Sequence, residues 1–303
     1  MRRVLLTGAS GLLGSAVQDR LNADGYAVSP CYHSVSRPGG EALDVADARS
    51  VADVFERTRP ELVVHCAGWA DVVRCEDIPD RARLVNAWGT ELVAEQAARH
   101  AARLVHVSTD WVFPGTARGG YREYDPVQPL QVYGQTKLAA EEAVTAIAGS
   151  LVVRVPLLYS LEPWPRPTWP TQALAWLSRG EPVLADDVEI RQPALISDVA
   201  DCLLALIKLG ATGVVHVAPA QTCTKFGWSR LLARSVEIPD ELVRLAPQPD
   251  RPDRPLRSTL CTPRLVEWGI SPPRGVSDVA SAGRAALLRQ LSSQTRRAPL
   301  RER

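Results

Sequence analysis

A glycine-rich turn close to the N-terminus is the feature that most constrains the fold of this chain. Gly8, Gly11 and Gly14 follow the short apolar segment 4–6 and begin segment 12–21, whose apolar spacing is that of an amphipathic helix. Glycines here allow a tight bend and a close approach of backbone N–H groups to a pyrophosphate, which the helix N-terminus also attracts. The spacing is G-x-x-G-x-x-G rather than the commoner G-x-G-x-x-G, but its place between strand and helix favours a dinucleotide site over a plain connection. We predict that the turn binds its ligand through Gly8, Ser10, Gly11, Leu12, Leu13 and Gly14.

Strand and helix signals alternate through the first half of the chain. Such alternation predicts an α/β fold of the Rossmann type, in which helices cover both faces of a doubly wound parallel sheet. The expected strands are 4–6, 26–28, 62–64, 104–107, 151–153 and 214–217, and the expected helices between them include 92–102 and 137–148.

The alternation of strand and helix signals becomes irregular after Arg154, which suggests a second, smaller unit. Segment 160–170 is rich in proline and tryptophan, and segment 247–255 is a further irregular stretch. Trp164 and Trp169 lie in the first of these, in a loop that either covers a substrate or packs without a ligand role. We expect residues 1–155, with about 188–220, to form an NADP(H)-binding Rossmann domain. Residues 156–187 and 221–291 would form a substrate lobe, and 292–303 a disordered tail.

Composition excludes several classes of protein. The formal net charge of +1 offers no global field that would attract nucleic acid or an anionic membrane. The N-terminal apolar run is too short for a signal peptide, and no stretch approaches the ~20 apolar residues of a membrane span. The six cysteines show neither C-x-x-C nor metal-ligand spacing. We therefore expect a cytoplasmic protein with reduced thiols.

The segment after the second strand bears on the choice of dinucleotide. NAD sites commonly place an acid here to bind the ribose 2′-hydroxyl, but residues 29–37 contain none. A 2′-phosphate could instead be bound by His33, Ser34 and Arg37. NADP(H) is therefore the preferred cofactor, with NAD(H) as the second option. Asp44 and Val45 follow where a side chain can contact adenine, although Asp44 could equally cap the next helix.

Tyr133 and Lys137 stand four residues apart on an expected helix and therefore share one face. A tyrosine pKa near 10 is too high for rapid proton transfer at neutral pH, and a nearby ammonium would lower it. Of the 35 basic residues only Lys137, Lys208 and Lys225 are lysines, so a lysine at this spacing from a tyrosine is unlikely to be accidental. The alternative is an exposed lysine beside a packed tyrosine.

Small polar residues end the expected strand 104–107, in the sequence VHVSTDWVFPGT. Thr109 can reach the same point as Tyr133, where its hydroxyl could hold a substrate carbonyl while the phenol delivers a proton. Ser108 is the neighbouring candidate for this role. Capping of the next element by Ser108 or Asp110 is the alternative.

Together the glycine turn, Thr109, Tyr133 and Lys137 resemble the extended short-chain dehydrogenase/reductase superfamily. Longer segments resemble its dTDP-4-dehydrorhamnose reductase family over roughly the first 160 residues. These segments are HCAGWADVVRCE, LVNAWGT, HVSTDWVFPGT, YREYDPVQPLQVYGQTKLAAEE and VVRVPLLY, followed more loosely by RQPALISDVAD and GVVHVAPAQTCTKFGWSRLLA. The regulatory beta subunit of methionine adenosyltransferase shares the pattern.

The resemblance implies NAD(P)H-dependent reduction of a 4-keto-6-deoxy sugar attached to a nucleoside diphosphate. Tyr133 would protonate the ketone oxygen, Thr109 would orient it, and Lys137 would tune Tyr133 and bind the nicotinamide ribose. Further cofactor contacts would come from Cys66, Ala67, Gly68, Val107 and Val155. Sugar contacts would come from Trp69, Asp110 and Trp111. Arg191, and secondarily Arg257, could hold the pyrophosphate, although solvated surface arginines would look the same.

The chain departs from the family pattern at positions that would face substrate. Trp111 replaces a tyrosine, Val73 an aspartate, Leu157 a common aromatic and Ser160 a glycine. Some bacterial relatives carry a metal-binding glutamate where this chain has Ala16, so we expect no metal. These changes leave the cofactor residues intact and bear on the substrate.

Three functions compete. The first is a ketoreductase of a nucleotide-linked deoxysugar, and the second is the same chemistry on a different small carbonyl or imine. The third is an NADP-binding regulatory subunit without turnover, like the methionine adenosyltransferase beta subunit. The partner of either reductase would be a small molecule, with a homodimer as a further option.

Overall fold

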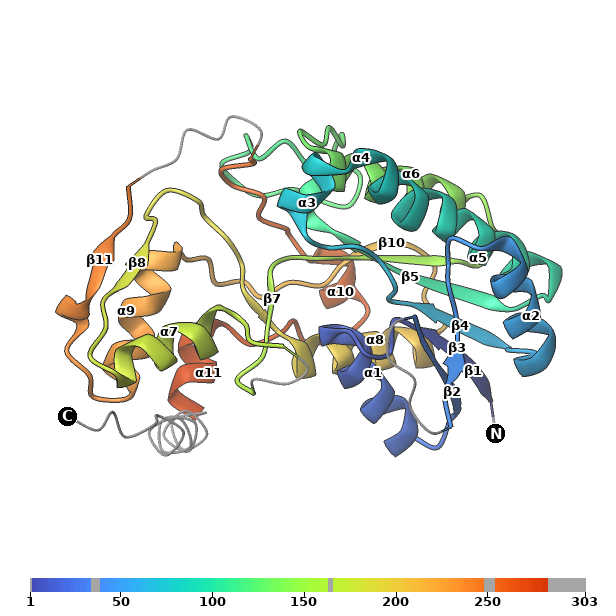
Figure 1. Ribbon diagram of the computed structural model, residues 1–303, viewed down its shortest axis with the longest axis horizontal. Helices are drawn as coiled ribbons and strands as arrows, with labels where there is room; N and C mark the ends of the chain where they lie inside the picture. Colours follow the sequence, from blue (N-terminus) through green and yellow to red (C-terminus); the bar gives the residue numbers. More distant parts are fainter. Residues whose placement is uncertain (1, 34–38, 163–165, 248–253, 283–303) are drawn as a thin grey trace, which may run out of the picture.

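Seven parallel strands form one sheet at the centre of the larger part of the molecule (Figure 1). The computed structural model describes residues 2–33, 39–162, 166–247 and 254–282. Within them the strand order is β10-β6-β5-β4-β1-β2-β3, which confirms the predicted doubly wound Rossmann-type fold. The strands are β1 Arg3–Thr7, β2 Ala27–Tyr32, β3 Glu41–Ala42, β4 Leu62–His65, β5 Arg103–Thr109, β6 Leu151–Val155 and β10 Gly213–His216.

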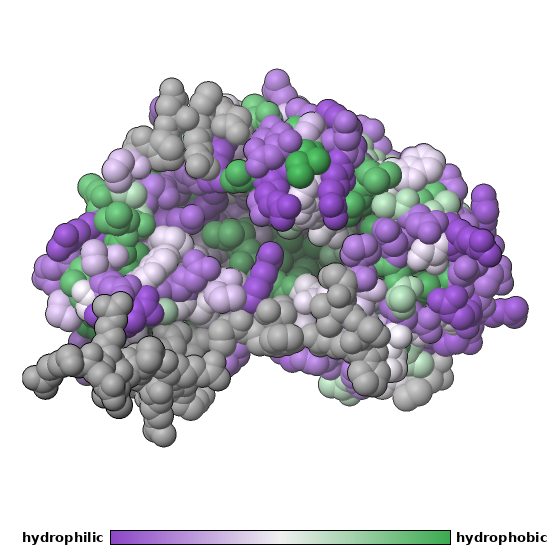
Figure 2. Space-filling view, in the orientation of Figure 1, coloured by the Kyte–Doolittle hydropathy of each residue, from purple (hydrophilic) through white to green (hydrophobic). Residues whose placement is uncertain are grey.

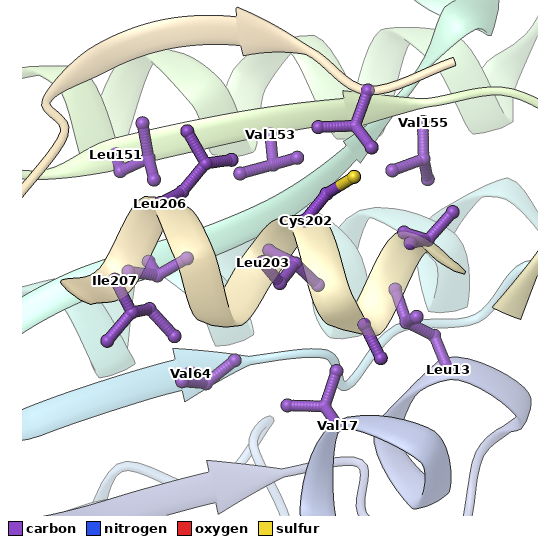
Figure 3. Close-up of a cluster of buried hydrophobic side chains, with 14 of the residues drawn as sticks. Leu13, Val17, Val64, Leu151, Val153, Val155, Cys202, Leu203, Leu206 and Ile207 are labelled. Atoms are coloured by element: carbon purple, nitrogen blue, oxygen red, sulfur yellow. The ribbon is translucent and has the colours of Figure 1, made fainter. Parts of the chain in front are cut away.

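Helices cover both faces of this sheet. On one face α1 (Leu12–Ala23) and α8 (Ile196–Leu209) pack against β4, β5 and β6 (Figure 3). Leu203, Leu206 and Ile207 of α8 point into this layer, so a helix from the C-terminal half of the chain completes the N-terminal core. The other face is covered by α2 (Ala48–Thr58), α5 (Gly89–Arg99) and α6 (Val132–Thr145).

Two elements run longer than the sequence patterns indicate. β2 continues through Pro30, which pairs with Leu6 of β1, whereas apolar residues predicted only 26–28. A proline near a sheet edge loses few ladder hydrogen bonds, and β3 beside it has only two residues. The helix predicted at 137–148 begins at Val132, so Tyr133 lies in its first turn.

A smaller unit forms from the C-terminal half, with its own apolar core. It pairs β8 (Val183–Ala185) with β11 (Val243–Leu245), and its core includes Trp228, Leu174 and Val279. Its helices are α7 (Trp169–Ser178), α9 (Lys225–Ser235) and α11 (Val276–Ala282). The remaining elements are α3 (Val72–Asp77), α4 (Pro79–Ala82), η1 (Arg83–Trp88), η2 (Asp110–Val112), β7 (Leu158–Tyr159), β9 (Ala194–Leu195), η3 (Asp240–Leu242) and α10 (Pro263–Glu267).

The smaller unit faces the sheet across a hollow at the centre of the view, with apolar residues on its floor (Figure 2). No helix in the described ranges is long and apolar enough to cross a bilayer. The expected tail 292–303, Ser34, Arg37 and Trp164 lie outside the described residues.

Candidate active site

A cleft of about 1610 Å³, part of it open to solvent, lies between the carboxyl ends of the sheet strands and the smaller unit. Ligands of open parallel sheets bind at this edge, because the loops after the strands converge there. The cleft is lined by Gly11, Leu12, Leu13, Gly14, Cys66, Ala67, Gly68, Val107, Thr109, Asp110, Trp111, Tyr133, Lys137, Val155 and Arg191 among the residues predicted from sequence.

The glycine turn at the start of α1 has the shape that a dinucleotide pyrophosphate requires. Gly8 has φ +68°, and a Cβ there would lie 2.6 Å from the backbone N of Ala67. A Cβ on Gly14 would lie 2.1 Å from the Gly8 carbonyl oxygen, so side chains are excluded on both sides of the turn. Gly11 caps α1 without a side-chain hydrogen bond, which leaves the first N–H groups of the helix for a ligand. These residues therefore fit NAD(P).

The predicted adenosine end of this site is only partly described. His33 lies 3.7 Å from Asp44 across an exposed ion pair, outside the residues that line the cleft. The Asp44 carboxylate accepts a hydrogen bond from Ala46 N, and Asp47 caps α2 by accepting from Arg49 N. The alternative in which Asp44 caps this helix is therefore wrong.

Val45 and Ser10 also lie outside the cleft lining. Val45 is buried, and its carbonyl oxygen would lie 3.0 Å from a Cβ on Gly89 at the start of α5. Ser10 is half-buried in the glycine turn. Contacts of either residue with a cofactor stay predictions.

Tyr133 lies in the first turn of α6, where Gly134 lets the helix approach the turn that carries Trp111. A Cβ on Gly134 would lie 2.3 Å from the Trp111 carbonyl oxygen. Burial raises the pKa of the Tyr133 phenol, and a hydrogen bond with the Thr109 hydroxyl opposes this increase. Lys137 is not among the groups that shift this pKa in the free protein, where its ammonium donates to β5, and the expectation that it lowers the pKa stays a prediction.

Lys137 is buried beneath the cleft, with its side chain 5% exposed. Its Nζ donates to the Val107 carbonyl oxygen at 2.7 Å and lies 3.0 Å from His106 Nε2. Burial lowers the pKa of this ammonium to about 8, although Glu141 and then Cys66 favour the charged form. Lys137 thus stands where it can reach a cofactor from within the protein.

Two stacked histidines underlie Lys137. The rings of His106 and His65 lie 5.3 Å apart, and burial keeps the pKa of both well below the ordinary value. His65 Nδ1 lies 2.7 Å from Thr7 Oγ1, which accepts from Ala67 N, and its Nε2 lies 3.0 Å from Thr90 Oγ1. This network fixes the loop after β4, and the sequence patterns did not indicate it.

Thr109 supplies the cap that the sequence analysis assigned to Ser108 or Asp110, and its contact with a substrate carbonyl stays a prediction. Its Oγ1 accepts from Trp111 N at 3.2 Å, which caps the short helix η2, and donates to Asp110 Oδ1 at 3.1 Å. The cap is therefore Thr109 itself and neither Ser108 nor Asp110. Ser108 also lines the cleft, and its hydroxyl donates to Glu141 Oε1 at 2.5 Å.

A buried ion pair anchors α6 to the sheet. Glu141 of α6 and Arg154 of β6 are 3% and 5% exposed, and Arg154 Nη2 lies 2.7 Å from Glu141 Oε2. Arg154 Nε donates to the same carboxylate at 3.0 Å. Because Glu141 follows Lys137 by one helical turn, the pair fixes the part of α6 that carries the lysine.

Asn86 links the same helix to the loop after β4. It lies in the π-helical turn η1, where its Oδ1 accepts from Trp69 N at 2.6 Å. Its Nδ2 donates to Thr136 Oγ1 at 3.1 Å, and Thr136 donates to the Tyr133 carbonyl oxygen at 2.8 Å. Asn86 belongs to the segment LVNAWGT, which carries part of the family resemblance, but it was not singled out from sequence.

Asp110 is 3% exposed, and both of its oxygens are bonded to protein. Besides the Thr109 contact, its Oδ2 accepts from Ser258 Oγ at 2.5 Å. Burial raises its pKa to about 6, opposed by Arg191 and by the hydrogen bonds of Ser258 and Thr109. Ser258 comes from an irregular segment far along the chain, where sequence offers no periodicity to identify it.

Cationic side chains form the opposite wall of the cleft around Trp111. The guanidinium carbons of Arg191 and Arg254 lie 5.4 and 5.6 Å from the centre of the indole ring. Arg191 is bound through Nη2 to Glu189 at 2.8 Å and through Nη1 to the Pro255 carbonyl at 2.7 Å. Arg254 also pairs with Glu189, at 3.3 Å.

Sequence reasoning missed Arg254 and also the other cations of this wall, Arg166 and Lys225. Lys225 Nζ lies 4.8 Å from the ring centre of Trp169, which itself begins α7 and donates to Ser229. The rarity of lysine that singled out Lys137 would also have singled out Lys225. The third lysine, Lys208, pairs with Asp24 on the surface.

Two of the residues predicted to contact substrate lie elsewhere in the structure. Trp69 and Arg257 do not line the cleft. The Trp69 ring packs beneath the guanidinium groups of Arg74 and Arg81, at 5.6 and 5.5 Å. Val73 and Leu157 do line the cleft and are 51% and 37% exposed, so they add apolar surface to it.

The chain matches known proteins over nearly its whole length. The family model described as "RmlD substrate binding domain" matches residues 1–282. Methionine adenosyltransferase 2 subunit beta of Xenopus tropicalis is 32% identical, over 89% of this chain and 83% of that protein. The dTDP-4-dehydrorhamnose reductase of Streptomyces griseus is 35% identical, over 72% of this chain and 68% of that protein.

Solved structures agree with this assignment. The dTDP-4-dehydrorhamnose reductase of Bacillus anthracis in complex with NADP has a TM-score of 0.82 and 25% identity, and covers 93% of this chain and 98% of its own. The fold, the glycine turn and these relatives all agree, and the chain belongs to the dTDP-4-dehydrorhamnose reductase-like family of extended short-chain dehydrogenase/reductases.

Proposed function

We propose that the protein is an NADPH-dependent ketoreductase that reduces the 4-keto group of a dTDP-linked 6-deoxyhexose. The observation that carries this proposal is the convergence of Thr109, Tyr133 and Lys137 on the cleft that the glycine turn also lines. When bound, the nicotinamide would supply the hydride. The relatives named as dTDP-4-dehydrorhamnose reductases, one of them in complex with NADP, support this choice of chemistry and cofactor.

The side chains have complementary tasks in this reaction. Tyr133 protonates the ketone oxygen, and general acid help of this kind is worth roughly 10²–10⁴ in rate. Thr109 holds the same oxygen in place. Lys137 binds the nicotinamide ribose and, once turned toward it, lowers the pKa of Tyr133, which burial keeps high in the free protein.

The second wall of the cleft supports a diphosphate-bearing substrate. Arg166, Lys225 and Arg254 face it, whereas Glu189 is the one carboxylate lining that wall among the described residues. The resulting positive charge would attract a nucleoside diphosphate. Most N–H donors of Arg191 already bind the protein, so Arg191 would act on the substrate by holding the Trp111 ring in place.

Two other functions have specific support. The apolar Val73 and Leu157, with Trp111, favour reduction of a different and less polar carbonyl or imine in the same cleft. The similarity to methionine adenosyltransferase 2 subunit beta favours an NADP-binding regulatory subunit. A stable complex with a methionine adenosyltransferase, without NADPH oxidation, would identify the second of these.

The deciding experiment is NADPH oxidation followed by absorbance with freshly made dTDP-4-keto-6-deoxyglucose, with and without a C3/C5 epimerase. Turnover that disappears in Tyr133→Phe would support the ketoreductase, and dependence on the epimerase would name the epimerised sugar as substrate. Tight NADPH binding without turnover would refute the proposal. The comparison would then move to other carbonyl compounds and to protein partners.

A further inference from the structure

The Lys137 ammonium has three hydrogens, and β5 accepts two of them. Nζ donates to the Val107 carbonyl oxygen at 2.7 Å and lies 3.0 Å from His106 Nε2. Because an ammonium has no lone pair, His106 Nε2 can only accept in this contact. Lys137 also lines the cleft, and its third hydrogen has no acceptor among the described residues. One donor of this buried ammonium is therefore left for a ligand of the cleft.

Accepting at Nε2 fixes the tautomer of His106. Burial, and then the charge of Lys137, keeps the pKa of this imidazole well below its ordinary value, so the ring is neutral and carries its hydrogen on Nδ1. Nδ1 is buried and has no hydrogen-bond partner in the part of the chain that the structure describes. A buried N–H without an acceptor destabilises the folded state, so stability alone does not favour a histidine here. A ring without a partner on Nδ1 also has no path by which to pass a proton onward.

The neighbouring His65 has the opposite tautomer, and both of its ring nitrogens are bonded. Thr90 Oγ1 donates to the Asn86 carbonyl oxygen at 2.7 Å, so it can only accept from His65 Nε2, at 3.0 Å. His65 Nδ1 then accepts from Thr7 Oγ1 at 2.7 Å. The two buried rings stack at 5.3 Å, yet of the two only His106 has an unpartnered nitrogen. The hydrogen bonds of His65 account for its place in the core, whereas His106 bonds to Lys137 alone through its ring.

We propose that His106 is a positioning residue that directs the third hydrogen of Lys137 toward the cofactor. The proposal rests on the contact of Lys137 with the nicotinamide ribose that is proposed above. Two fixed acceptors, the imidazole and the Val107 carbonyl, hold the tetrahedral ammonium in one orientation, in which its third hydrogen can donate to a ribose hydroxyl. Without His106 the ammonium could turn about its bond to Val107, and cofactor binding would have to restrict that motion. The histidine therefore pre-organises the lysine.

The first test observes the contact directly and needs neither cofactor nor turnover. NMR of protein labelled with ¹⁵N-histidine distinguishes a protonated ring nitrogen from an unprotonated one, and the chain has only five histidines. Below the pKa of Lys137, which burial lowers to about 8, His106 should be protonated on Nδ1 and His65 on Nε2. The His106 signals are identified by their loss in His106→Gln. An Nε2–H tautomer of His106 in the wild type would overturn the proposal.

The second test measures the effect of the contact on cofactor binding. His106→Leu removes the acceptor, whereas His106→Gln retains one, because its amide oxygen can take the place of Nε2. The Kd of NADP⁺, from the quenching of tryptophan fluorescence, should rise about tenfold in His106→Leu and stay within about threefold of the wild type in His106→Gln. Urea unfolding of each variant checks that it is folded. A Kd in folded His106→Leu that equals or falls below that of the wild type would overturn the proposal.

A double-mutant cycle separates positioning from a general effect on the fold. If His106 acts through Lys137, adding His106→Leu to Lys137→Met should leave the Kd of NADP⁺ at the value of Lys137→Met alone. A further tenfold loss in the double variant would contradict the proposal. NADP⁺ binding that follows the expected pattern supports it even where the protein reduces no dTDP-linked sugar, and in that case only the proposed substrate fails.

Discussion

The buried ammonium of Lys137 should make the stability of this protein depend on pH in an unusual direction. Burial lowers its pKa to about 8 from an ordinary value of 10.5. Below about pH 8 the lysine is charged in both the folded and the unfolded chain, so folding bears the full penalty of burying the charge. Between about pH 8 and 10.5 the unfolded chain binds more protons than the folded one, and the free energy of unfolding therefore rises with pH.

The expected size follows from the two pKa values. One pKa unit corresponds to about 1.4 kcal/mol, so the interval from about 8 to 10.5 corresponds to roughly 3 kcal/mol. This increase in the free energy of unfolding occurs only in the wild type, because Lys137→Met has no group that titrates at this position. The free energy of unfolding of the wild type, minus that of the variant, should therefore rise by roughly 3 kcal/mol across this pH range.

Urea unfolding of both proteins without cofactor measures this difference, because bound NADPH would add its own pH dependence. Lys208→Met is the control: Asp24 raises the pKa of this exposed lysine, so the wild type should lose stability relative to that variant at high pH. A difference between wild type and Lys137→Met that stays constant with pH would refute the reasoning. It would mean that the ammonium is as easily protonated in the folded protein as in the unfolded chain.

Three further predictions concern the helix and the cleft. Glu141→Gln leaves the buried Arg154 charge unpaired and should lower the free energy of unfolding by about 3–5 kcal/mol, measured in urea. Gly134→Ala places a Cβ 2.3 Å from the Trp111 carbonyl oxygen, so the start of α6 must move and kcat/KM should fall by about 10²-fold. Lys225→Met should raise the KM of a diphosphate-bearing substrate by roughly 10–100-fold, with the Kd of NADPH unchanged.

Each of these has a matched comparison. Replacing Glu141 and Arg154 together by leucine should restore much of the lost stability, because no buried charge then remains. Gly227→Ala meets nothing closer than 3.4 Å and should retain activity. An equal loss of NADPH affinity in Lys225→Met would place that lysine on the cofactor side of the cleft and contradict the prediction.

Sequence reasoning succeeded where a local pattern fixes the structure. The apolar runs that became β1, β4, β5 and β6 are buried on both faces, so their composition alone distinguishes them. The glycine turn was predictable because both of its neighbours, a strand and a helix, are adjacent in sequence. The prediction for β2 was too short because the apolar residues end at Val28, whereas the strand continues through Pro30 near a sheet edge that tolerates a proline.

In the candidate site, too, only the residues that a local pattern brings together were predictable. Tyr133 and Lys137 were predictable because a helix brings residues four apart onto one face. The hydrogen bond between Ser258 and Asp110 joins residues 148 positions apart and depends on an irregular segment, so no periodicity in the sequence predicts it. The contacts of a buried side chain are also not predictable from sequence. The sequence suggested that Lys137 would set the pKa of Tyr133, but the lysine is bound to the Val107 carbonyl oxygen.

The two walls of the cleft are held in place by different kinds of contact. Tyr133 and Lys137 lie on a regular helix held by the Glu141–Arg154 pair, so a change there disturbs the core as well as the chemistry. The opposite wall is built from loops joined by polar contacts, such as Arg191 with Glu189 and with the Pro255 carbonyl. Substitutions on that wall remove contacts between loops and leave the sheet intact. We therefore expect that the substrate can change while the proposed proton and hydride chemistry stays, and that the cationic residues of that wall would first recognise a different substrate.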